Sequence, residues 1–288
     1  MSQTLLCRVQ RDAVFVTGPD ATSFLQSLLS QDLDPVAVGD STHALLLAPQ
    51  GKLVVDLHAV HTRDEQWCCV CEAGFGATLA DGLNRFRIRV DVDIESRSPH
   101  TDAVALRGPD ASALLASVAV PDGVIVARTD WPTGPGLDVW YEPPAEPLIA
   151  ALISAGAVEI DADAFETLRI EAGVPRQGFD IDETTIAQEA FLERDAVSFT
   201  KGCFLGQELV CRIDSRGHVN RFLRRVRATG PLARGAAVMS GGTDVGTVTS
   251  AAGTVGLATI RRTVEPGGEV LIRNGTAEVT ARVEAVDA

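Results

Sequence analysis

The chain has 288 residues, of which 45% are hydrophobic and 22% are charged. This length corresponds to about two domains, and the composition excludes wholesale disorder and collagen-like repeats. The longest apolar stretches are far shorter than the roughly 20 residues of a membrane helix, and the first residues do not read as a signal peptide, so we expect a cytoplasmic protein. The net charge of −14 argues against non-specific coating of nucleic acid, which depends on Lys and Arg neutralising phosphates.

A short motif occurs twice, as Gly18-Pro19-Asp20-Ala21 and as Gly108-Pro109-Asp110-Ala111. Each copy follows a β-type run and precedes apolar residues at helical spacing, so Asp20 and Asp110 are predicted to cap two helices. A local strand–helix pair cannot bury its own apolar face. Two copies therefore predict two related α/β modules packed together, and the alternative is a common turn used twice.

Between and after the two copies, strand and helix patterns alternate without strict strand–helix–strand order. This favours an α+β fold over a doubly wound parallel sheet. Asp163 is the candidate cap of a strong helix that Gly173 and Pro175 end. The predicted strands cover residues 44–48, 53–60, 66–71, 88–94 and 137–141, and the predicted helices cover residues 73–86, 147–155 and 164–172.

The six cysteines do not form a disulfide framework, because a cytoplasmic chain of this length rarely uses one. Cys68, Cys69 and Cys71 share one strand-like run. A metal site would need more ligands at Cys-x-x-Cys or His spacing, so we interpret the three as small buried hydrophobes and predict no resident metal.

From about residue 221 the pattern changes to short β-type runs separated by glycine-rich turns. Six such runs predict a small barrel or sandwich, and Asn274-Gly275 predicts a type I′ hairpin turn. The predicted domains are residues 1–215, made of modules at about 1–100 and 101–215, and a barrel at 216–288. The runs cover residues 222–228, 236–239, 245–249, 255–260, 269–273 and 277–286.

The stretch at residues 201–227 holds seven basic residues against two acids, inside an acidic chain. Such a patch attracts anions that carry carboxylates or phosphates. The alternative is that the arginines from Arg221 to Arg227 alternate outward on the first barrel strand and pair with acids elsewhere.

Cys203 lies between two glycines and two residues after Lys201. A nearby ammonium and free loop amides favour the thiolate, and Gln207 and Glu208 add an amide and a carboxylate to the same loop. We interpret Cys203 as a reactive thiol. The alternative is a small residue that packs.

The run Lys201-Gly202-Cys203-Phe204-Leu205-Gly206-Gln207-Glu208 resembles the signature of the YgfZ proteins, the folate-binding relatives of the glycine cleavage T-protein. The resemblance extends to residues 168–175, to Pro49-Gln50-Gly51-Lys52 with Asp56, and to Arg212, Arg216 and Arg221. It spans nearly the whole chain.

This resemblance implies T-protein-like modules around a central channel that binds tetrahydrofolate, followed by a C-terminal β-barrel. Glu171 is carried over as the acceptor for the pterin ring, and Lys52 as the partner of the glutamate tail. The alternative for Glu171 is a surface carboxylate on a helix. Cys203 is the catalytic candidate, and the folate-binding candidates are Glu171, Asp56, Lys52, Lys201, Gln207 and Arg216.

The chain departs from the T-protein at the pair of acids used in aminomethyl transfer. One acid is replaced by Val55 and one preceding glycine by Lys52, which argues against that reaction. The T-protein lacks the cysteine, so Cys203 points to thiol or iron–sulfur chemistry.

The resemblance implies a tetrahydrofolate-binding factor that assembles or maintains iron–sulfur clusters, and thereby supports tRNA-modifying enzymes. One thiol cannot hold a [4Fe–4S] cluster, so a transient cluster would be shared with a partner. Expected partners are folate and iron–sulfur or cluster assembly proteins, without a membrane or stably bound nucleic acid. The alternatives are a folate-dependent aminomethyltransferase and an RNA or protein adaptor.

Overall fold

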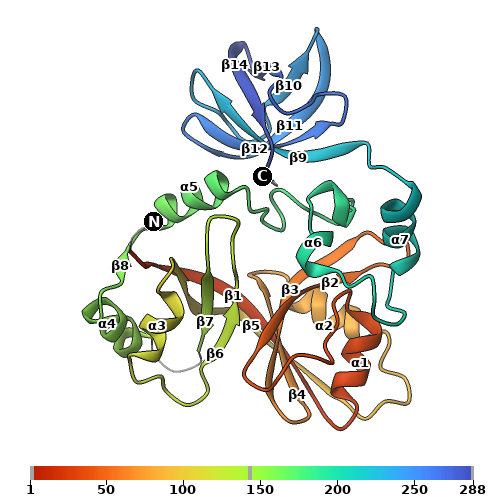
Figure 1. Ribbon diagram of the computed structural model, residues 1–288, viewed down its shortest axis with the longest axis vertical. Helices are drawn as coiled ribbons and strands as arrows, with labels where there is room; N and C mark the ends of the chain where they lie inside the picture. The colour runs from red at the N-terminus through yellow and green to blue at the C-terminus, as the bar shows by residue number, and fades with distance from the viewer. Residues whose placement is uncertain (1–2, 142–144, 287–288) are drawn as a thin grey trace. The chain divides into compact units, whose positions relative to one another are not determined.

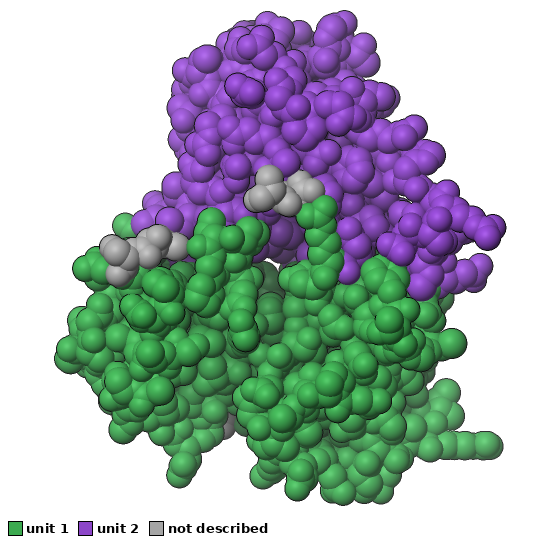
Figure 2. Space-filling model, viewed as in Figure 1, with its two compact units in different colours: residues 1–162, 194–207 green, residues 163–193, 208–288 purple. Residues whose placement is uncertain are grey.

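The computed structural model describes residues 3–141 and 145–286, and for residues 98–102 it describes the backbone only (Figure 1). The chain divides into two compact units, which Figure 2 colours separately. Unit 1 comprises residues 1–162 and 194–207, and unit 2 comprises residues 163–193 and 208–288. In the part of the chain that is described, no helix combines the length and the apolar character needed to cross a membrane.

Unit 1 is built on an eight-stranded sheet, counted over the described residues, with the order β2-β3-β4-β1-β5-β7-β6. The two long strands β1 and β5 pair antiparallel at its centre, and β8 runs parallel to the start of β1. The strands are β1 (Leu5–Thr17), β2 (Ser41–Leu47), β3 (Leu53–Arg63), β4 (Gln66–Glu72), β5 (Asp93–Arg107), β6 (Ile125–Arg128), β7 (Gly136–Trp140) and β8 (Val158–Glu159).

Each copy of the repeated motif forms a strand, a turn and a helix, as predicted. β1 leads into α1 (Ala21–Leu28), and β5 leads into α3 (Ala111–Ala116). Both turns depend on glycine, because Gly18 and Gly108 have φ values of +137° and +147°. A Cβ on Gly18 would lie 2.2 Å from the Asp91 carbonyl oxygen, which makes a larger residue impossible there.

The predicted helix caps are wrong. Neither Asp20 nor Asp110 makes a side-chain cap hydrogen bond to its helix. The Asp20 carboxylate instead accepts a hydrogen bond from the Asp91 amide at 2.8 Å, so it ties the first turn to the start of β5. The third predicted cap, Asp163, lies inside α5, which begins one residue before it and ends before Gly173.

Three hydrophobic clusters lie in the described part of unit 1, and two of them contain the helices of the two motif copies. In Figure 1, α1 and α2 (Gly76–Asn84) lie beside β2, β3 and β4, and α3 and α4 (Glu146–Ser154) lie beside β6 and β7. Leu25, Trp67 and Leu79 are fully buried in the first cluster, and Val139 and Leu152 in the second. The shared sheet therefore buries the apolar faces that neither motif could bury alone.

The cysteines of β4 are core residues, as interpreted from the sequence. Cys68 and Cys69 are fully buried and Cys71 is 3% exposed. Burial raises the pKa of Cys69 to about 12, so its thiol stays protonated and behaves as a small hydrophobe.

The predicted strand at residues 88–94 is wrong. β5 begins only at Asp93, and Ile88 is 72% exposed. Arg89 has a φ of +58°, which breaks extended geometry before the strand can start.

Unit 2 carries a closed barrel with the strand order β10-β11-β12-β9-β14-β13, which confirms the predicted C-terminal barrel. Asn274 pairs with Ala277, so the predicted hairpin turns through Gly275 and Thr276. Of these residues, Gly275 alone has positive φ, and the type I′ assignment is therefore wrong. The strands are β9 (Arg221–Ala228), β10 (Ala237–Ser240), β11 (Thr243–Ala252), β12 (Val255–Arg261), β13 (Glu269–Asn274) and β14 (Ala277–Glu284).

Between β8 and the barrel, the described chain forms one short 3₁₀ helix (Ala187–Glu189) and three α-helices. The α-helices are α5 (Ala162–Ala172), α6 (Glu193–Ala196) and α7 (Gln207–Arg216). The sequence analysis placed Gln207 and Glu208 in one loop with Cys203, and this is wrong, because both belong to the first turn of α7. Helix α7 buries Val210 but leaves most of its other side chains partly or fully exposed.

Candidate functional site

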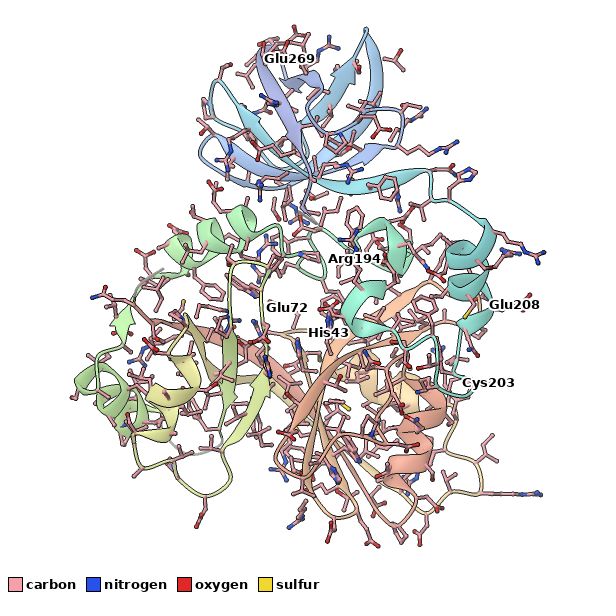
Figure 3. All side chains as sticks on the ribbon, in the orientation of Figure 1. His43, Glu72, Arg194, Cys203, Glu208 and Glu269 are labelled. Carbon is pink, nitrogen blue, oxygen red and sulfur yellow. The ribbon has the colours of Figure 1, made fainter. Side chains whose placement is uncertain are left out.

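The signature segment, defined here as residues 194–206 of unit 1, carries Cys203 on the loop that precedes α7. Figure 3 shows Cys203 on this loop, well away from His43. All six cysteines lie in the described part of the chain, and among them Cys203 is exposed, Cys211 is half-buried and the other four are buried. Cys203 is therefore the thiol that a reagent or a partner protein reaches most easily.

Lys201 fastens this segment to the end of α1. Its Nζ atom donates to the carbonyl oxygens of Gln26 at 2.7 Å, Leu29 at 2.8 Å and Gln31 at 2.8 Å. Gln26 belongs to the last turn of α1, and Leu29 and Gln31 follow its end, where a cation is favoured and acceptors lack helical partners. Burial lowers the pKa of Lys201 to about 8, against the opposing charges of Asp32 and Asp34. The role of Lys201 in folate binding stays a prediction.

Gly206 brings the signature segment directly onto the turn between β2 and β3. Its φ is +79°, and a Cβ at this position would lie 2.5 Å from the Ala48 carbonyl oxygen and 3.1 Å from the Gly51 Cα atom. Lys52 follows this turn and is exposed. The structure therefore brings together two motifs that are 150 residues apart in the sequence.

The two lysines of the chain allow a paired test of the anchoring. We expect Lys201→Met to lower the free energy of unfolding by about 1.5–3 kcal/mol, because three carbonyls lose a charged donor. Lys52→Met should change it by less than about 0.5 kcal/mol, because the side chain is exposed. Urea denaturation measures both values, and equal values would contradict the anchoring.

Asp56, on β3, bonds to a histidine that the sequence analysis did not identify. The His43 Nε2 atom on β2 lies 2.5 Å from Asp56 Oδ1, and its Nδ1 atom lies 3.1 Å from Asp195 Oδ2 on α6. The His58 ring stacks on that of His43 with centroids 4.8 Å apart. Asp195 lies 152 residues from His43, so no local pattern could have predicted this contact.

The two carboxylates control the charge of His43. Burial lowers the pKa of His43, but the opposing charges and hydrogen bonds of Asp56 and Asp195 outweigh it and raise the pKa to about 10. Burial and the charge of His43 lower the pKa of His58 to about 4. At neutral pH, an imidazolium therefore lies between two carboxylates and against a neutral ring.

In unit 2, Glu171 lies near the end of α5 and faces the barrel strand β9. Its two carboxylate oxygens accept from Arg227 Nη1 at 3.0 Å and Nη2 at 2.6 Å. This bidentate bond lowers the pKa of Glu171, so the group is ionised. Arg225 bonds to Glu284 at 2.8 Å. These two arginines pair with acids, as the alternative interpretation of the basic stretch predicts.

Two of the predicted site residues, Gln207 and Arg216, lie on α7. The full set of predicted site residues is divided between the two units. Arg216 is exposed in the last turn of α7, where the helix dipole favours a cation. Unit 2 contains Glu171 and Arg216, and unit 1 contains Lys52, Asp56, Lys201, Cys203 and Gln207. Across the described residues, no group of His, Cys, Asp and Glu side chains is arranged to hold a metal ion.

Residues 11–134 match the family described as the GCVT N-terminal domain, and residues 221–286 match the CAF17 C-terminal beta-barrel domain. An aminomethyltransferase of Rubrobacter xylanophilus is 30% identical over 281 residues, which cover 89% of this chain and 75% of the relative. The chain belongs to the aminomethyltransferase family. A second family member, from Herpetosiphon aurantiacus, is 29% identical over 82% of this chain and 71% of its own length.

The fold agrees with this family. The structure of the glycine cleavage system aminomethyltransferase T from Bartonella henselae matches 99% of this chain and 86% of its own, with a TM-score of 0.84. Its sequence identity of 21% makes this a likeness of fold. The predicted T-protein-like fold with a C-terminal barrel is therefore confirmed.

Proposed function

We propose that the protein binds tetrahydrofolate and assists the assembly or maintenance of iron–sulfur clusters, with Cys203 as its reactive thiol. The observation that carries this proposal is the exposed Cys203 in a loop packed on the β2–β3 turn, within a chain that joins a GCVT domain to a CAF17-type barrel. Through its client proteins, this activity supports cluster-dependent enzymes, including those that modify tRNA. One thiol supplies one ligand, so the cluster is a cargo shared with a partner protein.

The side chains carried over from the resemblance are chemically suited to a folate. Glu171 is ionised, and each carboxylate oxygen has two lone pairs, so it can accept from a pterin while Arg227 holds it. Lys52 is exposed and offers a cation to a glutamate tail. Asp56 supplies a second carboxylate that is 21% exposed. When bound, tetrahydrofolate supplies the one-carbon chemistry of this family.

Glu171→Gln is the direct test of folate binding. We expect tetrahydrofolate affinity to fall by roughly 10- to 100-fold, because hydrogen bonds to a charged acceptor are lost. Anaerobic calorimetry measures the Kd. Glu278→Gln is the control, since Glu278 forms a similar Arg–Glu pair with Arg273 on the barrel. If both variants bind like the wild type, the role of Glu171 is refuted.

Asp56 also supports a second candidate function, the transfer of an aminomethyl group to tetrahydrofolate. Asp56 keeps one of the two acids of the T-protein pattern, but Val55 is fully buried in the core and can move no proton. The purified protein is incubated with an aminomethyl donor and tetrahydrofolate, beside an active T-protein. Formation of methylenetetrahydrofolate would support transfer, and its absence beside a working control would exclude it.

A further inference from the structure

Two arginines of β9 hold Glu171 at two different points. The Arg227 guanidinium donates to both oxygens of the Glu171 carboxylate, at 3.0 Å and 2.6 Å. The Arg225 Nη1 atom donates to the Glu171 backbone carbonyl at 2.6 Å. One strand of unit 2 therefore fixes the end of α5 through both the backbone and the side chain of Glu171.

Glu284, the last residue of β14, joins these two arginines. Its Oε2 atom accepts from Arg225 Nε at 2.8 Å, and its Oε1 atom accepts from Arg227 Nε at 3.2 Å. β14 pairs antiparallel with β9, and Glu284 lies directly opposite Arg225 in that pairing. Each oxygen of Glu284 thus holds one guanidinium, and together with Glu171 the three side chains form a closed ring of charge-assisted hydrogen bonds.

The bidentate bond fixes the plane of the Glu171 carboxylate. A guanidinium that donates two parallel N–H bonds lies in the plane of the carboxylate and takes one lone pair from each oxygen. The second lone pair of each oxygen lies in the same plane and points away from Arg227. Glu171 can therefore accept a further hydrogen bond from a fixed direction, and its side chain is 40% exposed, so a ligand can reach it.

We propose that Arg227 and Glu284 are positioning residues that hold Glu171 in the orientation in which it accepts from the pterin ring. This inference rests on the proposed function, in which Glu171 bonds to tetrahydrofolate. In the described part of the chain, the charged groups that face Glu171 are Arg225 and Arg227 from β9 and Glu284 from β14. An acceptor that is already fixed binds a ligand more tightly than a mobile one, because less side-chain entropy is lost on binding.

The first test measures the affinity of the full chain for tetrahydrofolate by anaerobic calorimetry. Arg227→Met is expected to weaken binding about tenfold and Glu284→Gln about threefold, because the carboxylate of Glu171 is then free to rotate. Glu278→Gln is the matched control, since Glu278 lies on the same strand as Glu284 and also pairs with an arginine, Arg273. An affinity equal to or higher than that of the wild type in either test variant would overturn the proposal.

The variants are expected to fold like the wild type. The four side chains of the ring are between 22% and 45% exposed, and ion pairs at such positions add little to stability. Thermal unfolding of each variant checks this before binding is measured. A loss of affinity in a variant that unfolds like the wild type then reports on the orientation of Glu171.

Arg227→Lys separates the charge of the arginine from its geometry. Arg227 lowers the pKa of Glu171 through its hydrogen bonds and its charge. Lysine keeps the charge but cannot form two parallel bonds in one plane, so the pKa of Glu171 should stay low while the affinity for tetrahydrofolate falls. In Arg227→Met the pKa should rise as well, and ¹³C NMR of the Glu171 carboxyl group measures it in the folate-free protein. Wild-type affinity in Arg227→Lys would refute the role of the bidentate bond.

A double-mutant cycle separates positioning from direct contact with the folate. Arg227→Met combined with Glu171→Gln is expected to bind little more weakly than Glu171→Gln alone, because Arg227 acts through that carboxylate. Additive losses would show that Arg227 contacts the ligand itself and would overturn the proposal. If Glu171→Gln weakens binding while Arg227→Met does not, the positioning role fails and the proposed function stands.

Discussion

Cys203→Ala is expected to abolish the ability of the protein to restore a cluster-dependent enzyme in cells that lack it. The free energy of unfolding should change by less than about 0.5 kcal/mol, because the side chain is exposed and leaves no core cavity. Affinity for tetrahydrofolate should stay near that of the wild type, since the folate candidates are other side chains. Activity of the client enzyme in cell extracts measures the loss.

The matched control for this loss is Cys211→Ala. Cys211 lies eight residues further along the chain, on α7, and is half-buried. The Cys211→Ala variant should restore the client enzyme fully if the chemistry belongs to the exposed thiol of Cys203. If Cys203→Ala restores the client enzyme as well as the wild type does, the proposed role of the thiol is refuted.

The elements that could be predicted are those whose signals are local. Six β-type runs with glycine-rich turns were enough to predict a small barrel or sandwich, because each hairpin is specified by its own residues, and the structure is the barrel. The Gly-Pro turn could be recognised at two places in the sequence, and in the structure each turn joins a strand to a helix. The predicted helix caps were wrong. The Asp20 carboxylate accepts a hydrogen bond from the Asp91 amide, a tertiary contact that local capping patterns do not include.

The parts of the site that escaped prediction depend on long-range contacts. The bonds of Lys201 to the carbonyls of Gln26, Leu29 and Gln31 span about 170 residues, and His43 bonds to Asp195 across 152. Helix α7 was missed because it buries few side chains, so its apolar periodicity is weak. The motifs could be read from the sequence alone, but their mutual placement depends on the sheet that joins them.

The central sheet of unit 1 contains a buried charge cluster, and Asp138 is its common acid. Asp138 Oδ1 accepts from Arg107 Nη2 at 2.7 Å and from the Thr129 hydroxyl at 3.1 Å, while Oδ2 accepts from Arg11 Nε at 2.9 Å. The side chains of Asp138 and Arg107 are 4% and 3% exposed. These bonds join β1, β5 and β7, the strands on which both copies of the motif depend.

Asp138→Asn is expected to lower the free energy of unfolding by about 3 kcal/mol, because it leaves the buried Arg107 guanidinium without its anion and takes from Arg11 one of its two acids, the other being Glu72. Asp93→Asn is the control. Asp93 pairs with Arg87 at 2.9 Å but is 89% exposed, so this substitution should lower the free energy of unfolding by about 0–1 kcal/mol. Guanidinium chloride denaturation measures both variants. Equal losses would contradict the central role of the cluster.

The same cluster predicts how stability depends on pH. Burial alone would raise the pKa of Asp138, but Arg107 and Arg11 hold it well below its ordinary value of 3.8. A carboxyl with a lowered pKa stabilises the fold fully above its unfolded value, and this contribution is lost as the pH falls from there toward the folded value. Unfolding midpoints measured between pH 7 and pH 2 should therefore fall more steeply below about pH 4 in the wild type than in Asp138→Asn. Parallel curves would show that the charge of Asp138 does not stabilise the sheet.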